Sequence, residues 1–339
     1  MKNHKSLGCI LVTGGAGFIG SHLCERLLQE GYRVVSFDNF NNFYDRSIKE
    51  RNIASVRSQS TNGKFLSIDG DIRDKSRLFE VIEKERPLCV IHLAAMAGVR
   101  PSLQDPLLYT DVNVIGTQLL LEACVGMKVR HFIFASSSSV YGNNPKVPFA
   151  ETDCVDYPIS PYAATKKAGE LICYNYFHLY AMRIACLRFF TVYGPRQRPD
   201  LAIHKFARAI EGGQEIPMYG DGGSLRDYTY IEDCISGILG ALNWVVVEKE
   251  APAAYEIVNL GESRMISLAD MIASIEKALG KKAKIQRLPH QPGDVERTYA
   301  DISKARRLFG YAPSTDFDIG IRQFVDWLHS LKKTGVEVS

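Results

Sequence analysis

A glycine-rich segment near the start of the chain restricts the fold more than any other part of the sequence. The apolar run at residues 10–12 predicts a buried strand, and the amphipathic residues 18–29 predict a helix. Gly14, Gly17 and Gly20 punctuate the turn between them. Glycines at these positions suit a tight turn, a close approach by a pyrophosphate, and close packing of helix on strand. The segment therefore predicts a strand, a phosphate-binding turn and a helix.

The residues around this turn favour NAD as the ligand. At the helix N-terminus, free N–H groups near Phe18 and Ile19 and the positive end of the helix dipole would face the phosphates. Asp38 ends the next apolar run, 18 positions after Gly20, where an acidic residue accepts hydrogen bonds from an adenosine ribose. An acid there repels a 2′-phosphate, so NAD is favoured over NADP. Without the acid, the glycine pattern alone could mark only a tight turn.

Two further predicted strands end in residues suited to a cofactor. Residues 64–68 predict a third strand, and an acidic and an apolar residue after it could pair with and cover an adenine, or form only a turn with a helix cap. Residues 88–93 predict a fourth strand that ends in small residues, against which a cofactor could lie. The cofactor-binding residues predicted here are Asp71, Ile72, Leu93, Ala94 and Ala95.

The order of elements predicts an α/β fold of the Rossmann type, a doubly wound parallel sheet with a smaller C-terminal α/β substrate lobe. Strands and helices alternate through five predicted strands, without an internal repeat. Residues 1–193 and 227–261 are expected to form the dinucleotide-binding domain, and residues 194–226 and 262–339 the lobe. The local expectations are a loop over 39–51, a strand over 131–135, and helices over 106–124, 161–180, 201–211, 268–279 and 315–332.

Composition narrows the class of protein. A net charge of +3 without a basic stripe argues against nucleic acid as a partner. The eight cysteines form no C-x-x-C pair and the eight histidines show no ligand spacing, so no metal site is expected. No segment has the length and composition of a membrane span or a signal peptide. The expected location is the cytoplasm, with buried thiols in a reducing compartment.

A candidate catalytic cluster follows the fifth strand. Ser136–Ser139 stand at the carboxyl end of that strand, where they suit hydrogen bonds to hydroxyls or form a solvated loop. Tyr162 and Lys166 lie four residues apart and so share one face of the next predicted helix. A nearby ammonium group and a charged nicotinamide would favour the phenolate of Tyr162, making it a candidate general base with a serine that orients the same hydroxyl.

Together these motifs resemble the extended short-chain dehydrogenase/reductase superfamily over essentially the whole chain. The matching motifs are the glycine turn, the run S-S-S-S-V-Y-G from Ser136, and Tyr162-x-x-x-Lys166. Within that superfamily the chain resembles the UDP-glucuronate 4-epimerases. The motifs that carry this resemblance are R-F-F-T-V-Y-G-P-R-Q-R-P-D from Arg188, R-D-Y-T-Y-I-E-D from Arg226 and Q-P-G-D-V from Gln291.

The resemblance implies roles for individual residues. Tyr162 would be the base, Lys166 its modulator and a ribose ligand, and Ser137 the hydroxyl partner, although an adjacent serine could take that place. Arg226 would hold the diphosphate and Asp294 the uridine ribose. The family implies a homodimer formed through the helices near 106–124 and 161–180. Ser137, Ser138, Ser139, Thr191, Arg198, Arg226 and Asp294 are the predicted substrate-binding residues.

The region after residue 190 favours a uronic acid as the sugar. Related galactose epimerases have Asn where Thr191 stands, and here Arg196 and Arg198 add donors and positive charge that a sugar carboxylate could use. Alternatively, both arginines contact only the diphosphate or solvent. Oxidising C-4 of glucuronic acid creates a β-keto acid, which loses carbon dioxide when its carboxylate turns perpendicular to the carbonyl. Thr191, Arg198 and the serines could prevent that orientation.

The sequence therefore predicts 4-epimerisation of UDP-glucuronate through oxidation and re-reduction with the same NAD. The closest alternative is a 4-epimerase of UDP-glucose or UDP-N-acetylglucosamine, followed by a UDP-glucuronate decarboxylase. A nucleotide-sugar dehydratase would have an Asp-Glu pair where this chain has Ser138 and Ser139. From another class, the chain could be a non-catalytic sensor of NAD or nucleotide sugars, against which the intact Tyr162 and Lys166 argue.

Overall fold

The computed structural model describes residues 7–60, 63–246, 252–289 and 297–333. Its main feature is a seven-stranded sheet, all of whose neighbouring strands are parallel, in the order β10-β6-β5-β4-β1-β2-β3. The predicted fold class is confirmed. The sheet consists of β1 (Cys9–Thr13), β2 (Arg33–Asp38), β3 (Phe65–Asp69), β4 (Cys89–His92), β5 (His131–Ser137), β6 (Arg183–Phe189) and β10 (Ala254–Leu260).

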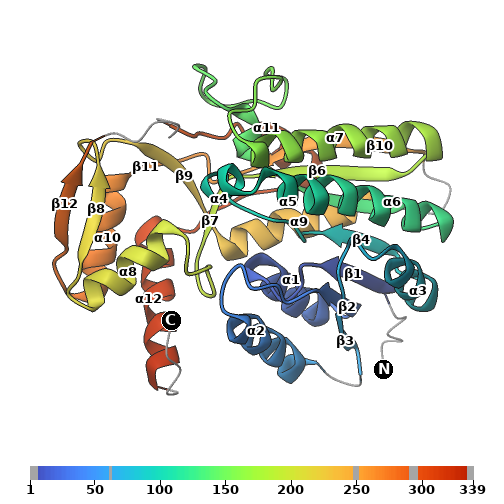
Figure 1. Ribbon diagram of the computed structural model, residues 1–339, viewed down its shortest axis with the longest axis horizontal. Coiled ribbons are helices and arrows are strands. Elements are labelled where there is room, and N and C mark those ends of the chain that lie inside the picture. The colour runs from blue at the N-terminus through green and yellow to red at the C-terminus, as the bar shows by residue number, and fades with distance from the viewer. Residues whose placement is uncertain (1–6, 61–62, 247–251, 290–296, 334–339) are drawn as a thin grey trace.

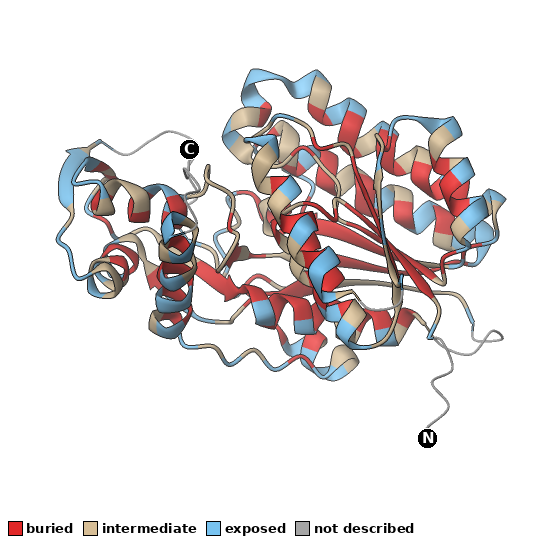
Figure 2. Ribbon diagram, turned by 90° about the horizontal axis from the view of Figure 1, so that it is seen from below, coloured by how far each residue is buried: buried red, intermediate tan, exposed pale blue. Residues whose placement is uncertain are grey.

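Helices cover both faces of this sheet, which explains why its strands are apolar almost throughout. In β1, Ile10 and Val12 join one buried cluster, whereas Leu11 joins a second cluster on the opposite face. The two layers of helices, and the buried sheet between them, are visible in Figures 1 and 2. One layer consists of α1 (Phe18–Gln29), α2 (Arg46–Gln59) and α9 (Ile231–Val245), and the other of α3 (Lys75–Glu85), α6 (Gly116–Gly126) and α7 (Pro161–Tyr180).

The strand order reverses direction between β1 and β4. The chain moves outward from β1 to β2 and β3, then returns to β4 on the other side of β1. In open parallel sheets, the carboxyl ends of the strands on either side of such a reversal leave a crevice where ligands bind. This topology therefore places the ends of β1, β4 and β5 beside one another.

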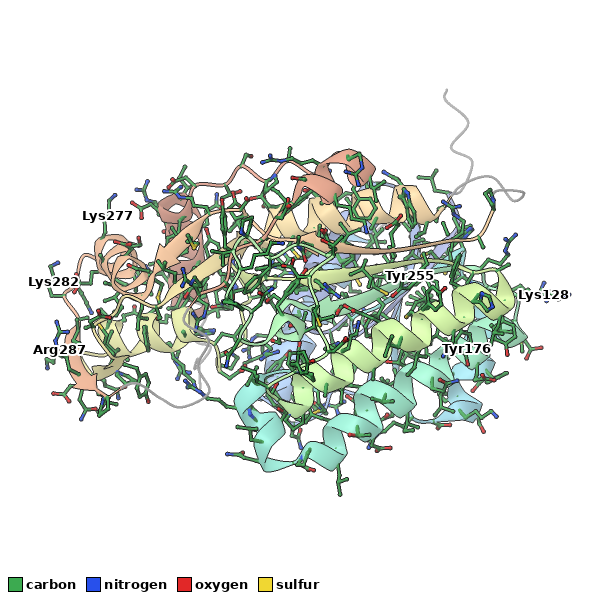
Figure 3. All side chains as sticks on the ribbon, turned by 90° about the horizontal axis from the view of Figure 1, so that it is seen from above. Lys128, Tyr176, Tyr255, Lys277, Lys282 and Arg287 are labelled. Atoms are coloured by element: carbon green, nitrogen blue, oxygen red, sulfur yellow. The ribbon has the colours of Figure 1, made fainter. Side chains whose placement is uncertain are left out.

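A smaller lobe stands at one end of the molecule (Figure 1). Figure 3 shows Lys277, Lys282 and Arg287 extending from this lobe, while Tyr176 lies on α7 and Tyr255 beside that helix in the larger part. A three-stranded sheet connects the two parts through β9 (Leu225–Tyr230), which pairs with β7 (Thr191–Tyr193) and β11 (Met265–Ser267). The lobe contains α8 (Ala202–Glu211), β8 (Glu215–Tyr219), α10 (Leu268–Leu279), β12 (Lys284–Leu288) and α12 (Phe317–Lys333), and α11 (Ser303–Phe309) packs on α9.

Three local predictions were wrong. The predicted loop over 39–51 contains the start of α2, because the Asp45 side chain accepts a hydrogen bond from the Ser47 N–H at 2.8 Å and caps the helix. The predicted helix over 106–124 is α5 (Pro106–Thr110), a π-helical turn at Asp111–Ile115, and α6, preceded by α4 (Val99–Gln104). The strand predicted over 131–135 continues to Ser137, so β5 includes the first two serines.

Other features concern the membrane, metals and thiols. Across residues 7–60, 63–246, 252–289 and 297–333, no helix has the length and apolar composition needed to cross a membrane. Within the same ranges, no group of three potential metal-ligating side chains occurs. All eight cysteines are free thiols, and only Cys154 among them is exposed.

Candidate active site

A cavity of about 480 Å³ lies at the carboxyl edge of the sheet, where the strand order reverses. It brings together most of the residues predicted as cofactor-binding, catalytic or substrate-binding. Those that line it are Gly14, Gly17, Phe18, Ile19, Gly20, Asp38, Ile72, Leu93, Ala94, Ala95, Ser137, Ser138, Ser139, Tyr162, Lys166, Thr191 and Arg198.

The glycine turn forms one wall of the cavity, and its shape requires glycine. Gly14 has φ +72°, and a Cβ atom there would lie 2.7 Å from the backbone N of Ala94. At Gly20 a Cβ would lie 2.1 Å from the carbonyl oxygen of Gly14, so the helix packs tightly on the turn. The first turn of α1 has no side-chain cap at Gly17, which leaves its N–H groups available to an anion. This cradle fits a diphosphate.

Asp38, the last residue of β2, lines the adjacent wall of the cavity. Its carboxylate accepts hydrogen bonds from the N–H of Ala16 at 3.1 Å and of Phe40 at 2.9 Å. The buried ammonium of Lys49 lies 3.6 Å from the same carboxylate and donates to Asn41 at 3.1 Å. Lys49 therefore partly neutralises the acid that the sequence argument used to favour NAD, although the carboxylate remains fixed at the cavity.

Tyr162 and Lys166 extend from α7 toward the end of β5. Ser160 caps this helix by accepting a hydrogen bond from the Ala163 N–H at 3.1 Å. The Lys166 ammonium donates to the Ala135 carbonyl oxygen at 2.7 Å, and the hydroxyl groups of Tyr162 and Ser137 are hydrogen-bonded. The structure thus joins the three residues predicted as catalytic, with Ser137 as the serine that contacts Tyr162.

The protein itself does not lower the pKa of Tyr162. Burial raises that pKa, while the hydrogen bond from Ser137 and the charge of Arg198 act in the opposite direction. Burial also lowers the pKa of Lys166 to about 8. The sequence argument expected Lys166 to favour the phenolate. The Lys166 ammonium lies 5.9 Å from the centroid of the Tyr162 ring, and the charge of Arg198 also lowers the pKa of the phenol. A cationic group bound beside the phenol would add to the effect of Arg198.

The serines after β5 have separate partners. Ser136 donates to the Glu170 carboxylate at 2.6 Å, and Glu170 also accepts two hydrogen bonds from buried Arg188 at 2.8 and 2.9 Å. The Ser137 hydroxyl is instead hydrogen-bonded to the Ser139 hydroxyl at 3.1 Å, and it accepts from the Ser139 N–H at 3.1 Å. The Ser136 hydroxyl is therefore paired with an interior carboxylate, although all four serines line the cavity.

A buried polar network supports the opposite side of the cavity. His92 is hydrogen-bonded to Thr13 at 2.7 Å and to Thr117 at 2.9 Å, and burial lowers its pKa to about 3, so the ring is neutral. Asn113, in the π-helical turn, accepts from the Met96 N–H at 2.8 Å and donates to the Thr165 hydroxyl at 3.0 Å. This network ties the loop after β4 to the helix that carries Tyr162.

The two arginines of the loop after β7 point in different directions. Arg198 lines the cavity, forms a two-pronged ion pair with Asp200, and lies over the Phe43 ring at 5.3 Å from its centroid. Arg196 faces away from the cavity and donates to Glu25 of α1 at 2.8 Å. Of the two arginines that the sequence offered for a sugar carboxylate, only Arg198 is placed to contact a ligand in the cavity.

Two predicted residues in the described part of the chain, Asp71 and Arg226, are not among those that line the cavity. Asp71 is paired with Arg73 at 2.7 Å and accepts from Asn39 at 2.9 Å, and the Arg73 guanidinium lowers its pKa to about 2. Arg226 lies on β9, opposite Ile266 of β11. Asp294, with the Q-P-G-D-V motif, lies outside the described residues.

The structure adds residues that the sequence argument overlooked. Phe43 and Tyr44 line the cavity from the segment before α2, and the same wall includes Lys49. The missed helix cap at Asp45 was the available signal, since it would have placed Lys49 on the first turns of a helix beside Asp38. Phe189 and Phe190 line the cavity from the end of β6 and were passed over as part of a motif.

Comparisons with known proteins place this geometry among nucleotide-sugar enzymes. Residues 11–324 match the family model described as GDP-mannose 4,6 dehydratase. A probable UDP-glucuronate 4-epimerase from Rhizobium meliloti is 41% identical over 329 residues, which cover 94% of this chain and 96% of the relative.

Two solved structures are similar over nearly the full chain. The UDP-glucuronic acid 4-epimerase of Bacillus cereus, in complex with UDP-glucuronic acid and NAD, has a TM-score of 0.86 at 39% identity, covering 95% of this chain and 99% of that one. The UDP-glucose 4-epimerase of Thermus thermophilus, in complex with NAD, has a TM-score of 0.82 at 33% identity, covering 95% and 99% of the two chains.

Proposed function

The chain belongs to the GDP-mannose 4,6-dehydratase family of nucleotide-sugar enzymes, and from that premise we propose that it is an NAD-dependent isomerase that converts UDP-glucuronate to UDP-galacturonate. The observation that carries the proposal is the joining of Tyr162, Ser137 and Arg198 in one cavity beside the glycine turn. The resemblance to the UDP-glucuronate 4-epimerases, expected from the motifs, is confirmed by the relatives.

The residues present fit NAD. The glycine turn offers a cradle that a Cβ at Gly14 would fill, and the uncapped first turn of α1 suits the diphosphate. In the proposed complex Asp38 holds the adenosine ribose and Lys166 the nicotinamide ribose. Bound NAD would supply reversible hydride transfer at C-4 of the sugar, so the reaction would have no net redox change.

The chain's own residues move the proton and hold the sugar. Tyr162 takes the proton of the 4-hydroxyl as hydride leaves C-4, and returns it after the 4-keto sugar has turned over. Ser137 orients the phenol through their shared hydrogen bond, and the Arg198 charge favours the phenolate. The Lys166 ammonium donates to the Ala135 carbonyl oxygen, which fixes this side chain on the face of α7 that also carries Tyr162.

A second group of residues suits the sugar carboxylate. Thr191 and Arg198 line the cavity together with Ser138 and Ser139. Hydrogen bonds from these residues would keep the carboxylate of the β-keto acid from turning perpendicular to the carbonyl, so that carbon dioxide is retained. This retention separates the proposed epimerase from a UDP-glucuronate decarboxylase.

The remaining assignments concern binding and assembly. Arg226 is assigned to the diphosphate, Asp294 to the uridine ribose, and Asp71 and Ile72 to the adenine side. Residues 1–193 with 227–261 are assigned to the NAD domain, and residues 194–226 with 262–339 to the substrate lobe. The protein functions as a homodimer in the cytoplasm, and its free and mostly buried thiols support a reducing compartment.

The proposal is tested by incubating the purified protein with UDP-glucuronate, without added NAD, and analysing the products by NMR. The expected product is UDP-galacturonate with no pentose, made by cofactor that co-purifies. UDP-xylose or a 4-keto pentose would instead show that the carboxylate is not protected. Conversion of UDP-glucose or UDP-N-acetylglucosamine alone would move the assignment to a neutral-sugar epimerase, the alternative that the Thermus thermophilus structure favours.

Replacing the base provides a second test. Tyr162→Phe removes the hydroxyl that moves the proton while keeping the ring, which packs edge to face on Tyr109. We expect kcat to fall by about 10²–10⁴-fold, with UDP-glucuronate binding retained. A variant that turns over at the wild-type rate would require another base. A wild-type protein that binds NAD and UDP-sugars without turning them over would support the non-catalytic sensor.

A further inference from the structure

Arg198, which the proposed function assigns to the sugar carboxylate, is already held by a carboxylate of the chain itself. Its Nε donates to one oxygen of Asp200 at 2.9 Å, and its Nη2 donates to the other oxygen at 2.8 Å. A guanidinium binds a carboxylate most strongly through two parallel hydrogen bonds of this kind. The strongest binding edge of Arg198 is therefore taken before a substrate arrives.

We propose that Asp200 is a positioning residue that restrains Arg198, so that the arginine meets the sugar carboxylate through the N–H groups that Asp200 leaves free, on Nη1 and Nη2. This inference rests on the proposed function, because it concerns how the carboxylate of UDP-glucuronate is held. Phe43 reinforces the restraint, since its ring lies under the guanidinium and fixes the plane of that group. Asp200 does not line the cavity, and it acts on the substrate only through Arg198.

The reaction explains why such a restraint is useful. An epimerase must present both faces of its 4-keto sugar to one hydride carrier, so the sugar turns over while it is bound. A clamp from an unpaired, fully charged arginine would stabilise the starting complex and oppose that movement. By occupying the Nε and Nη2 edge of Arg198 and partly neutralising its charge, Asp200 weakens the grip of Arg198 while keeping its direction.

The restraint is tested with Asp200→Asn. The amide keeps the shape of the carboxylate but replaces one acceptor with a donor, so Arg198 is released and its strong edge becomes available to the sugar carboxylate. Binding is measured by titration calorimetry in the Tyr162→Phe background, where turnover is suppressed. We expect the Kd for UDP-glucuronate to fall by about tenfold, because the carboxylate that partly neutralises Arg198 is removed. The Kd for UDP-glucose, which has no carboxylate, should change less than twofold.

Turnover gives a second readout. With Tyr162 intact, Asp200→Asn should lower KM and kcat for UDP-glucuronate together, which is the signature of an overstabilised ground state. Damage to the fold would raise KM instead. Asp200→Ser, which removes the carboxylate without adding an amide donor, should act in the same direction.

The chain offers a matched control. Glu25→Gln makes the same carboxylate-to-amide change at the partner of Arg196, which faces away from the cavity. It should leave both dissociation constants unchanged. In an Arg198→Met background, Asp200→Asn should also have no effect on UDP-glucuronate, because Asp200 acts only through that arginine.

The outcomes separate the two proposals. A Tyr162→Phe protein that binds no UDP-glucuronate would overturn the proposed function, and the inference with it. Normal binding by Tyr162→Phe, with a Kd that stays the same or rises in Asp200→Asn and Asp200→Ser, would overturn the inference alone. An equal change for UDP-glucose, or an undiminished effect in the Arg198→Met background, would also overturn it.

Discussion

The roles of Arg196 and Arg198 depend on the carboxylate with which each one pairs. Arg196 and Arg198 stand two positions apart in one loop, yet Arg196 pairs with Glu25 and Arg198 with Asp200. Of these two arginines, only Arg198 acts on Tyr162. The charge of Arg198 lowers the pKa of the phenol, whereas burial raises it. Two identical side chains thus have different functions, one structural and one electrostatic.

This difference predicts a change in pH dependence. In the proposed mechanism Tyr162 acts as phenolate, so kcat rises as pH increases through its pKa. Arg198→Met removes a charge that lowers this pKa, so the pKa rises and the acidic limb of the kcat profile moves to higher pH. The measurement is kcat against pH with saturating UDP-glucuronate.

Arg196→Met is the matched control for that experiment. It removes the same positive charge from the same loop, but from the side that faces α1. The acidic limb of its kcat profile should lie at the same pH as in the wild type. If both variants moved the limb equally, net charge rather than the position of Arg198 would control Tyr162.

At the scale of elements, the end of β5 and the start of α7 hold each other residue by residue. Ala135 accepts from Lys166, Ser136 donates to Glu170, and the next serine contacts Tyr162. The three α7 residues are spaced four apart, so they lie on one face of the helix. Three consecutive strand residues therefore set the position and rotation of the catalytic helix.

The turn between β1 and α1 allows a prediction for a whole element. Gly14→Ala would place a Cβ 2.7 Å from the Ala94 backbone, at a φ of +72° that is already unfavourable for alanine. The turn must shift away from the loop after β4, and we expect the purified variant to contain little NAD. Cofactor content is measured by chromatography after denaturation.

Gly213→Ala separates the clash from the backbone strain. Gly213 has a similar φ of +69°, with no atom within 4 Å of an added Cβ. The Gly213→Ala variant should lose about 1–2 kcal/mol of folding stability, because alanine is unfavourable in a left-handed backbone conformation. It should retain its NAD. A Gly14→Ala protein with full cofactor content would show that the turn tolerates the displacement.

Regular patterns in the sequence predicted the elements that depend on local signals. The glycine turn, the fifth strand and the Tyr162 helix follow from hydrophobic periodicity and spacing, and the ends of α10 were predicted to the residue. The π-helical turn at Asp111–Ile115 was missed because hydrophobic periodicity hardly distinguishes it from an α-helix. Contacts between distant segments, such as Arg196 with Glu25, have no local signal at all.

At the scale of the whole molecule, the chain passes between the two parts more than once. Buried polar contacts stabilise the segments that connect them. The sequence predicted five strands for the sheet, whereas β6 and β10 extend it to seven. Asp227 of β9 accepts hydrogen bonds from the N–H groups of Glu262, Ser263 and Ala300. One buried carboxylate therefore fixes three segments that are distant in the sequence.

The surface of the larger part carries an apolar face that supports the proposed homodimer. Leu103 and Leu107, on α4 and α5, and Leu171 and Tyr174, on α7, are all exposed large hydrophobic residues. They lie on helices that contact one another, within or beside the ranges through which the resemblance implies a homodimer. We call them the α5–α7 face. Pairing two such faces would remove this apolar surface from water.

Leu171→Asp tests whether this face forms the dimer. A carboxylate at the centre of an apolar interface would be desolvated without a partner, so the variant should elute as a monomer where the wild type is a dimer. Mass is measured by light scattering after size exclusion.

Ile319→Asp, at an exposed apolar position on α12 in the lobe, is the control and should remain dimeric. A monomeric wild type would remove the homodimer proposal, and a dimeric Leu171→Asp would place the interface elsewhere. Because α7 also carries Tyr162 and Lys166, loss of the dimer should lower the thermal stability of the catalytic helix as well.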